Sequence, residues 1–94
     1  PFTALRFVQA AFQRKVNIFL VEDGVYVAKR GQKADVRVED MLRDAIKSGV
    51  TVKLCGNCAE ARGISQDELV EGAEMGIMKE LVEWVDRSDK VLTF

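Results

Sequence analysis

Residues 16–21 read VNIFLV, an almost unbroken run of β-branched and aromatic side chains. Such a run is typical of a strand that is covered on both faces, as strands in parallel sheets are. Glu22, Asp23 and Gly24 follow it and end the strand. A second strand is predicted at 50–54, where VTVKL runs directly into a Cys-Gly-Asn-Cys segment. These two stretches predict a parallel sheet at the centre of the fold.

Helices are predicted between and beside these strands, because apolar residues recur there at helical spacing. They cover residues 3–14, 38–48 and 77–87. A short helical turn is predicted at 57–62, and a further one begins at Ser65, which can form a capping box with Glu68. Segments 70–75 and 90–94 are predicted as further strands.

Helices that alternate with apolar strands indicate βαβ units and a mostly parallel sheet between helix layers. A chain of this class normally opens on a strand, so we expect a strand of about 5–6 residues before Pro1. The predicted fold class is therefore α/β, a flavodoxin- or Rossmann-like three-layer sandwich with four or five strands. At 94 residues the chain allows one domain, 1–94.

The composition excludes several function classes. Lys and Arg total 14 and Asp and Glu total 15, so the net charge of −1 gives no basic surface for nucleic acid or an anionic membrane. The sequence contains no His, which removes Ser-His-Asp catalysis and His-ligated zinc. No apolar stretch approaches the ~20 residues of a membrane span. No glycine-rich phosphate loop occurs, so no nucleotide cofactor is expected.

The two cysteines, Cys55 and Cys58, stand three residues apart where the second strand meets a predicted helix. A pair this close favours a reducing cytoplasm over a disulfide-stapled secreted fold. Ligands of open α/β sheets bind beyond the carboxyl ends of the strands, which is where Cys55 is expected. A helix N-terminus favours its thiolate, Gly56 leaves room for an approaching group, and Arg62 could add positive charge.

Other interpretations of the pair stay open at this stage. Both cysteines could be small buried apolar residues, or they could exchange electrons as a dithiol, as in thioredoxin-like proteins. The single proline, Pro1, counts against the thioredoxin fold, which sets a cis-proline opposite its motif. A metal site would need ligands from a second chain, since two thiolates do not complete a tetrahedron. Gly24 and Tyr26 follow the first strand and are candidates for the same crevice, with Tyr26 equally suited to packing.

Four segments in this order resemble the DsrE/DsrF-like family of small sulfur-relay proteins, TusD-type subunits included. They are FLVEDGVY at 19–26, VKLCGNCAEARGI at 52–64, EGAEMG at 71–76 and DKVLTF at 89–94. The resemblance extends over the whole chain. It implies the α/β fold above, with the family's first strand lying before the helix that opens this sequence.

The resemblance also implies a persulfide on Cys55, passed between a sulfur donor and an acceptor protein in the cytoplasm. Gly56 and Asn57 would stabilise the anionic sulfur through backbone N–H groups, with Arg62 and Tyr26 tuning or gating the pocket. Cys58 departs from a one-cysteine carrier and leaves room for release of sulfur through an internal disulfide. The family assembles as trimers or hexamers, so a homo-oligomer is expected. A dithiol redox or sensor protein and a non-catalytic oligomeric subunit are the alternatives.

Overall fold

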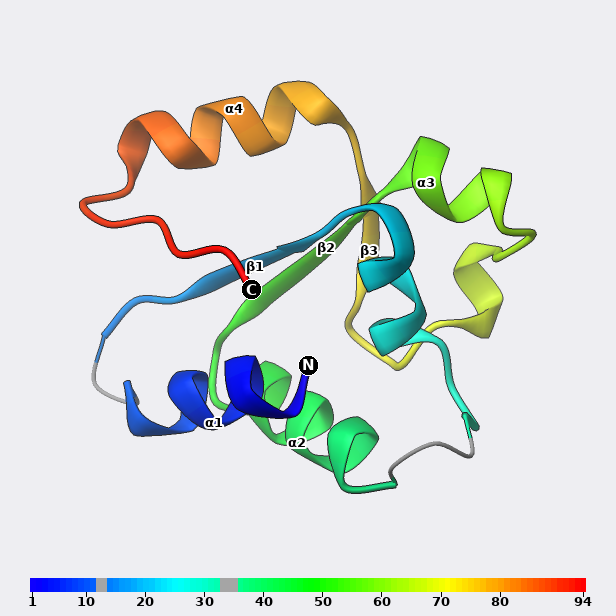
Figure 1. The fold of residues 1–94 in the computed structure, drawn as a ribbon, viewed down its shortest axis with the longest axis horizontal. Helices are drawn as coiled ribbons and strands as arrows, with labels where there is room; N and C mark the ends of the chain where they lie inside the picture. The colour runs from blue at the N-terminus through cyan, green and yellow to red at the C-terminus, as the bar shows by residue number, and fades with distance from the viewer. Residues whose placement is uncertain (12–13, 33–35) are drawn as a thin grey trace.

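The computed structural model describes residues 1–11, 14–32 and 36–94. Its strands are β1 (Asn17–Leu20), β2 (Thr51–Cys55) and β3 (Glu74–Gly76). They form one parallel sheet in the order β1-β2-β3, so β2 is the central strand (Figure 1). The register pairs Leu20 with Leu54, and Cys55 with Gly76. The carboxyl ends of all three strands therefore meet at one edge of the sheet.

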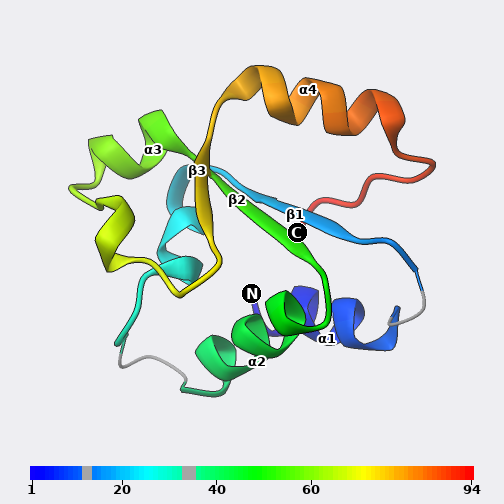
Figure 2. The ribbon, with the colours of Figure 1, turned by 180° about the vertical axis from the view of Figure 1, so that it is seen from behind.

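Helices cover the sheet on both faces. They are α1 (Phe2–Ala10), α2 (Val36–Lys47) and α4 (Met78–Arg87). Helices α1 and α2 lie together below the sheet in the view of Figure 1 and α4 lies above it, an arrangement that Figure 2 shows again from behind. The predicted three-layer α/β architecture and its three helices are confirmed, although α1 ends before residues 12–13, which lie outside the described residues.

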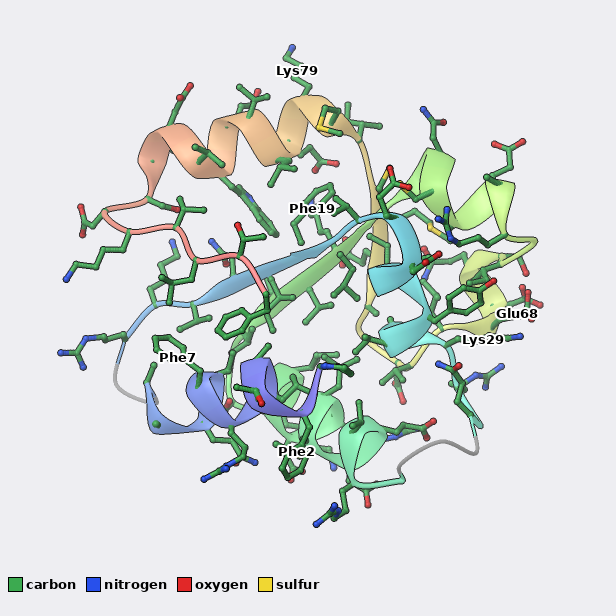
Figure 3. The ribbon with its side chains drawn as sticks, in the orientation of Figure 1. Phe2, Phe7, Phe19, Lys29, Glu68 and Lys79 are labelled. Carbon is green, nitrogen blue, oxygen red and sulfur yellow. The ribbon has the colours of Figure 1, made fainter. Side chains whose placement is uncertain are left out.

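Side chains of the central strand alternate between the two layers, as the two-residue period of a strand requires. Val52 and Leu54 are fully buried in the main core with residues of α1 and α2. Lys53 points to the opposite face, where its ammonium group lies 5.7 Å from the centre of the Trp84 ring of α4. Phe19 of β1 meets the same ring edge-on, with centroids 5.8 Å apart (Figure 3). The α4 layer thus rests on few, partly polar contacts.

Three further helices are short, and in the chain one of them follows β1 and two follow β2. They are η1 (Glu22–Ala28), α3 (Gly56–Ala61) and η2 (Gln66–Glu68). The predicted capping box is confirmed, since the Ser65 N–H donates to the Glu68 carboxylate at 3.0 Å. The apolar segment 25–28 forms the end of η1, where Val25 and Ala28 enter the core.

The predicted count of four or five strands, which included one expected before Pro1, is not confirmed, and the described residues form three. The strand predicted at 70–75 is shorter and later, at Glu74–Gly76. The strand predicted at 90–94 does not form, and Phe94 is 71% exposed with its ring 6.1 Å from that of Phe7. A strand needs a neighbour to take up its backbone hydrogen bonds, and this segment pairs with none of the described strands.

Candidate functional site

Strand β2 delivers Cys55 to the edge of the sheet where the parallel strands end. Cys55 is the last residue of β2 and also the N-cap of α3, with an extended backbone. The residue is 7% exposed, so its sulfur lies just beneath the surface. The predicted position at a strand-to-helix junction is confirmed, but the sulfur is more covered than a thiol at the mouth of an open pocket.

Cys58 supplies the polar surroundings of the Cys55 sulfur. Its backbone N–H lies 3.3 Å from Cys55 Sγ, which thereby replaces the oxygen that usually caps a helix. The Cys58 thiol also donates to this sulfur, and that hydrogen bond is the main reason why the pKa of Cys55 lies below its ordinary value. Burial opposes the shift, while the backbone N–H groups of Cys58 and Asn57 add to it.

The two thiols therefore differ in acidity. The hydrogen bond to Cys55 holds the proton on Cys58 and raises the pKa of that thiol above its ordinary value. Both cysteines are free thiols, and Cys58 is half-buried. Cys55 is therefore the more readily ionised of the two thiols, and the thiolate is the reactive form of cysteine.

Gly56 lies where α3 begins and passes close to the end of β3. A Cβ atom at this position would stand 3.2 Å from the carbonyl oxygen of Gly76, closer than side chains normally come to a backbone. Gly56 therefore lets the turn that bears the sulfur lie against the sheet. Asn57, the next residue, is exposed, and its contribution to the site comes from its backbone.

Arg62 joins α3 to η1 and does not contact the Cys55 sulfur through any hydrogen bond that the structure shows. Its Nε donates to Asp23 Oδ1 at 2.9 Å and its Nη2 to Glu22 Oε2 at 3.3 Å. Its Nη1 donates to the carbonyl oxygen of Cys58 at 3.0 Å. Arg62 thus holds the loop after β1 against the helix that carries both cysteines.

Glu22, which with Asp23 the sequence offers as a possible general acid or base after the first strand, acts on the electrostatics of both cysteines. Its carboxylate raises the pKa of both cysteines, whereas its backbone N–H favours the ionised form of Cys58. It also adopts a left-handed backbone with φ 51°, which is uncommon for a residue with a side chain. The available signal was its place directly after β1, at the edge where β2 also ends.

The remaining predicted residues lie on η1, which packs against α3. Tyr26 is 37% exposed, and its carbonyl oxygen accepts a hydrogen bond from the Gln32 side chain. Gly24 is half-buried, with open space where a side chain would begin. The structure brings these residues to the same edge of the sheet as Cys55 but shows no contact between the Tyr26 ring and either sulfur.

Two cavities of about 400 and 340 Å³ lie away from this edge. The larger is lined by residues of α1, the end of α2 and the segment before β1, and the smaller by Ile46, Gly72 and charged neighbours. Within residues 1–11, 14–32 and 36–94, no three Cys, Asp or Glu side chains gather as metal ligands. None of the helices described is both long and apolar enough to cross a membrane.

The hydrogen bond from Cys58 leads to a prediction for the pH dependence of thiol reactivity. Because this bond lowers the pKa of Cys55, its alkylation by iodoacetamide should be half-maximal at a lower pH than that of an ordinary cysteine. Cys58→Ala removes the donor and should move the midpoint to higher pH. Cys58→Ser keeps a hydroxyl donor and should move it less. Rates are measured for the Cys55 peptide by mass spectrometry, and equal midpoints in all three proteins would contradict this assignment.

Comparisons with known proteins place the chain in a family. The family model for the DsrE/DsrF-like family matches residues 1–94. An uncharacterised protein of Methanopyrus kandleri is 43% identical over 97 residues, covering 99% of this chain and 80% of the relative. The protein YchN of Escherichia coli K12 is 38% identical over 99 residues, covering 99% and 85%. The crystal structure of E. coli YchN matches with a TM-score of 0.89 and 37% identity over 99% of this chain and 85% of that one. The chain belongs to the DsrE/DsrF-like family.

Proposed function

We propose that this protein is a sulfur-relay protein that carries a persulfide on Cys55 and passes the sulfur to a partner. The family to which it belongs is associated with sulfur relay. The observation that carries the proposal is the environment of Cys55: its sulfur caps α3, accepts the Cys58 N–H at 3.3 Å and has a lowered pKa. Such a sulfur is a thiolate over more of the pH range than an ordinary thiol is.

The reaction consists of two thiol exchanges. In the first, the Cys55 thiolate attacks the outer sulfur of a donor persulfide, a new S–S bond forms on Cys55, and the donor leaves as a thiolate. In the second, an acceptor thiolate attacks the outer sulfur on Cys55, and the Cys55 thiolate leaves. A low thiol pKa serves both steps, because it supplies the nucleophile first and a good leaving group afterwards.

The neighbouring residues have distinct roles in this proposal. Backbone N–H groups of Asn57 and Cys58 stabilise the anionic sulfur, and Gly56 lets the turn approach β3. Arg62 positions the site by binding the Cys58 carbonyl group and the acidic loop after β1. Tyr26 lies at the rim, where a docking protein would meet it. We propose that both the sulfur donor and the sulfur acceptor are proteins and that the relay operates in the cytoplasm.

We also propose that the protein forms homo-oligomers. The outer side of α4 exposes Met78, Val82 and Val85, which recur at the spacing of one helix face. The family resemblance implies a trimer or hexamer, so light scattering should give the molar mass of one of these at micromolar concentration. A monomer under these conditions would contradict the proposal of self-association, while leaving the chemistry of Cys55 untouched.

The relay proposal is tested by incubating the reduced Cys58→Ser variant, in which Cys55 is the remaining cysteine, with inorganic polysulfide. Peptide mass spectrometry should find one additional sulfur atom on Cys55, removable by a reducing agent. Absence of this sulfur would reject the carrier function and leave a dithiol couple or a non-catalytic subunit.

A dithiol redox couple is the second candidate, favoured by the hydrogen bond between the two thiols. Substitution Cys58→Ser separates the two functions. A carrier still accepts sulfur on Cys55 in this variant, whereas a dithiol couple loses its activity altogether.

A further inference from the structure

Because Cys55 is largely buried, thiols of other molecules reach it less easily than the neighbouring Cys58 of the same chain does. The residue is 7% exposed, so a group of another molecule meets only a small part of its surface. Cys58 adjoins its sulfur atom, because the Cys58 backbone nitrogen lies 3.3 Å from Cys55 Sγ. These are the two cysteines of the chain, so Cys58 is the internal thiol that can attack Cys55.

A persulfide contains two sulfur atoms, and attack by a thiolate gives different products at each. When a thiolate attacks the outer sulfur, that sulfur moves to the attacker and Cys55 is released. When a thiolate attacks Sγ, a disulfide forms and the outer sulfur leaves as hydrosulfide. The outer sulfur is the terminal atom of a persulfide, so an external acceptor reaches it more easily than the Sγ atom behind it. Cys58, by contrast, adjoins Sγ itself.

We propose that Cys58 discharges a persulfide left on Cys55 by attacking Sγ, closing a Cys55–Cys58 disulfide and releasing hydrosulfide. This proposal rests on the proposed carrier function of Cys55. The bond between Sγ and the outer sulfur breaks as the bond between the two cysteine sulfurs forms. The outer sulfur gains two electrons, and the two cysteine sulfurs together lose two. The proton of the Cys58 thiol goes to the leaving sulfur, so a persulfide anion and a thiol become a disulfide and HS⁻.

The local geometry favours this closure. Cys55 and Cys58 hold the N-cap and N3 positions of α3, where side chains meet in a capping box. The Nη1 atom of Arg62 donates to the Cys58 carbonyl oxygen at 3.0 Å and fixes its backbone. The hydrogen bond that raises the pKa of Cys58 is made to the unloaded Cys55 sulfur. Once Cys55 carries a persulfide, its Sγ atom no longer bears that negative charge, so Cys58 can pass its proton to the outer sulfur and attack Sγ as a thiolate.

The consequence is a limit on how long the protein stores sulfur. An acceptor that arrives early takes the outer sulfur and leaves both thiols free. Without an acceptor, the sulfur leaves as hydrosulfide and the site closes as a disulfide. A dithiol reductant then returns both cysteines to thiols before the next loading.

The test compares the wild-type protein with Cys58→Ser and Cys58→Ala. Each protein is loaded to completion with inorganic polysulfide, freed of it by rapid gel filtration, and kept without added thiol. Intact mass spectrometry follows the additional sulfur, peptide mapping locates any disulfide, and a colorimetric assay measures the hydrosulfide. In the wild type, we expect loss of the sulfur at least about tenfold faster than in either variant, since the two thiols are held together. One hydrosulfide and one internal disulfide should form per chain.

The outcomes distinguish this inference from the function on which it rests. If all three proteins load sulfur on Cys55 and lose it at the same rate, the discharge by Cys58 is wrong and the carrier function stands. If neither variant accepts sulfur on Cys55, the carrier function is wrong and the inference falls with it. Rapid loss from the wild type without an internal disulfide would also overturn the discharge.

Discussion

Replacement of Cys55 by serine is expected to abolish persulfide formation while the protein stays folded. A hydroxyl group does not form a persulfide, and Cys55 is the cysteine at the N-cap of α3. Serine is a favoured N-cap residue whose oxygen can accept the Cys58 N–H, so the start of α3 should be preserved. Sulfur bound after polysulfide treatment, measured by intact mass, should fall to the background of an alkylated control.

A folding control accompanies this measurement. The free energy of unfolding of the Cys55→Ser variant should lie within about 1 kcal/mol of the wild type, because the side chains are nearly isosteric and the cap is retained. The result that would refute the role of Cys55 is full sulfur uptake by the variant. Uptake that moves to Cys58 would show instead that the second thiol accepts sulfur when the first is missing.

The largest effect on stability is expected for Gly72→Ala, just before β3. Gly72 has φ 94°, in the left-handed region, and a Cβ atom there would lie 2.6 Å from Cγ2 of Ile46. Ile46 is β-branched and belongs to α2, where its χ1 angle has little freedom. Backbone strain and overpacking together should destabilise the fold by about 2–5 kcal/mol. The melting temperature should fall by roughly 10 °C or more.

Gly49→Ala is the matched control for this variant. Gly49 has φ 107°, yet no atom lies within 4 Å of the position of its added Cβ. Its substitution should therefore cost only the backbone strain, about 1–2 kcal/mol. Thermal unfolding of both variants separates the two contributions. Equal losses at the two positions would show that the contact with Ile46 is relieved at no cost.

The sequence predicted most of the fold because its signals are local. The apolar run at 16–21 and the capping box at Ser65 each act through neighbouring residues, and both appear in the structure. The prediction of a strand at 90–94 was wrong. A strand forms only when it pairs with a partner, which can lie far along the chain, and no local pattern reveals that partner. The DsrE/DsrF-like resemblance carried by the quoted segments is confirmed by the family match over residues 1–94.

The sequence predicted where the candidate site lies but not which neighbouring groups set its electrostatics. The place of Cys55 followed from the direct passage of strand into helix. The partners of Arg62 did not follow, because Glu22 and Asp23 belong to a different strand end and meet Arg62 only in the folded chain. The donation from the Cys58 thiol likewise depends on the first turn of α3, which spacing alone does not orient.

The contact between Gly56 and Gly76 couples the turn that bears the sulfur to the last strand. Bare backbone meets bare backbone there, at a spacing tighter than most side chains adopt. A side chain added at residue 56 would therefore require the turn or the strand to shift by a few tenths of an ångström. Any such shift of the turn would also displace the Cys55 sulfur, because the two residues are adjacent in the chain.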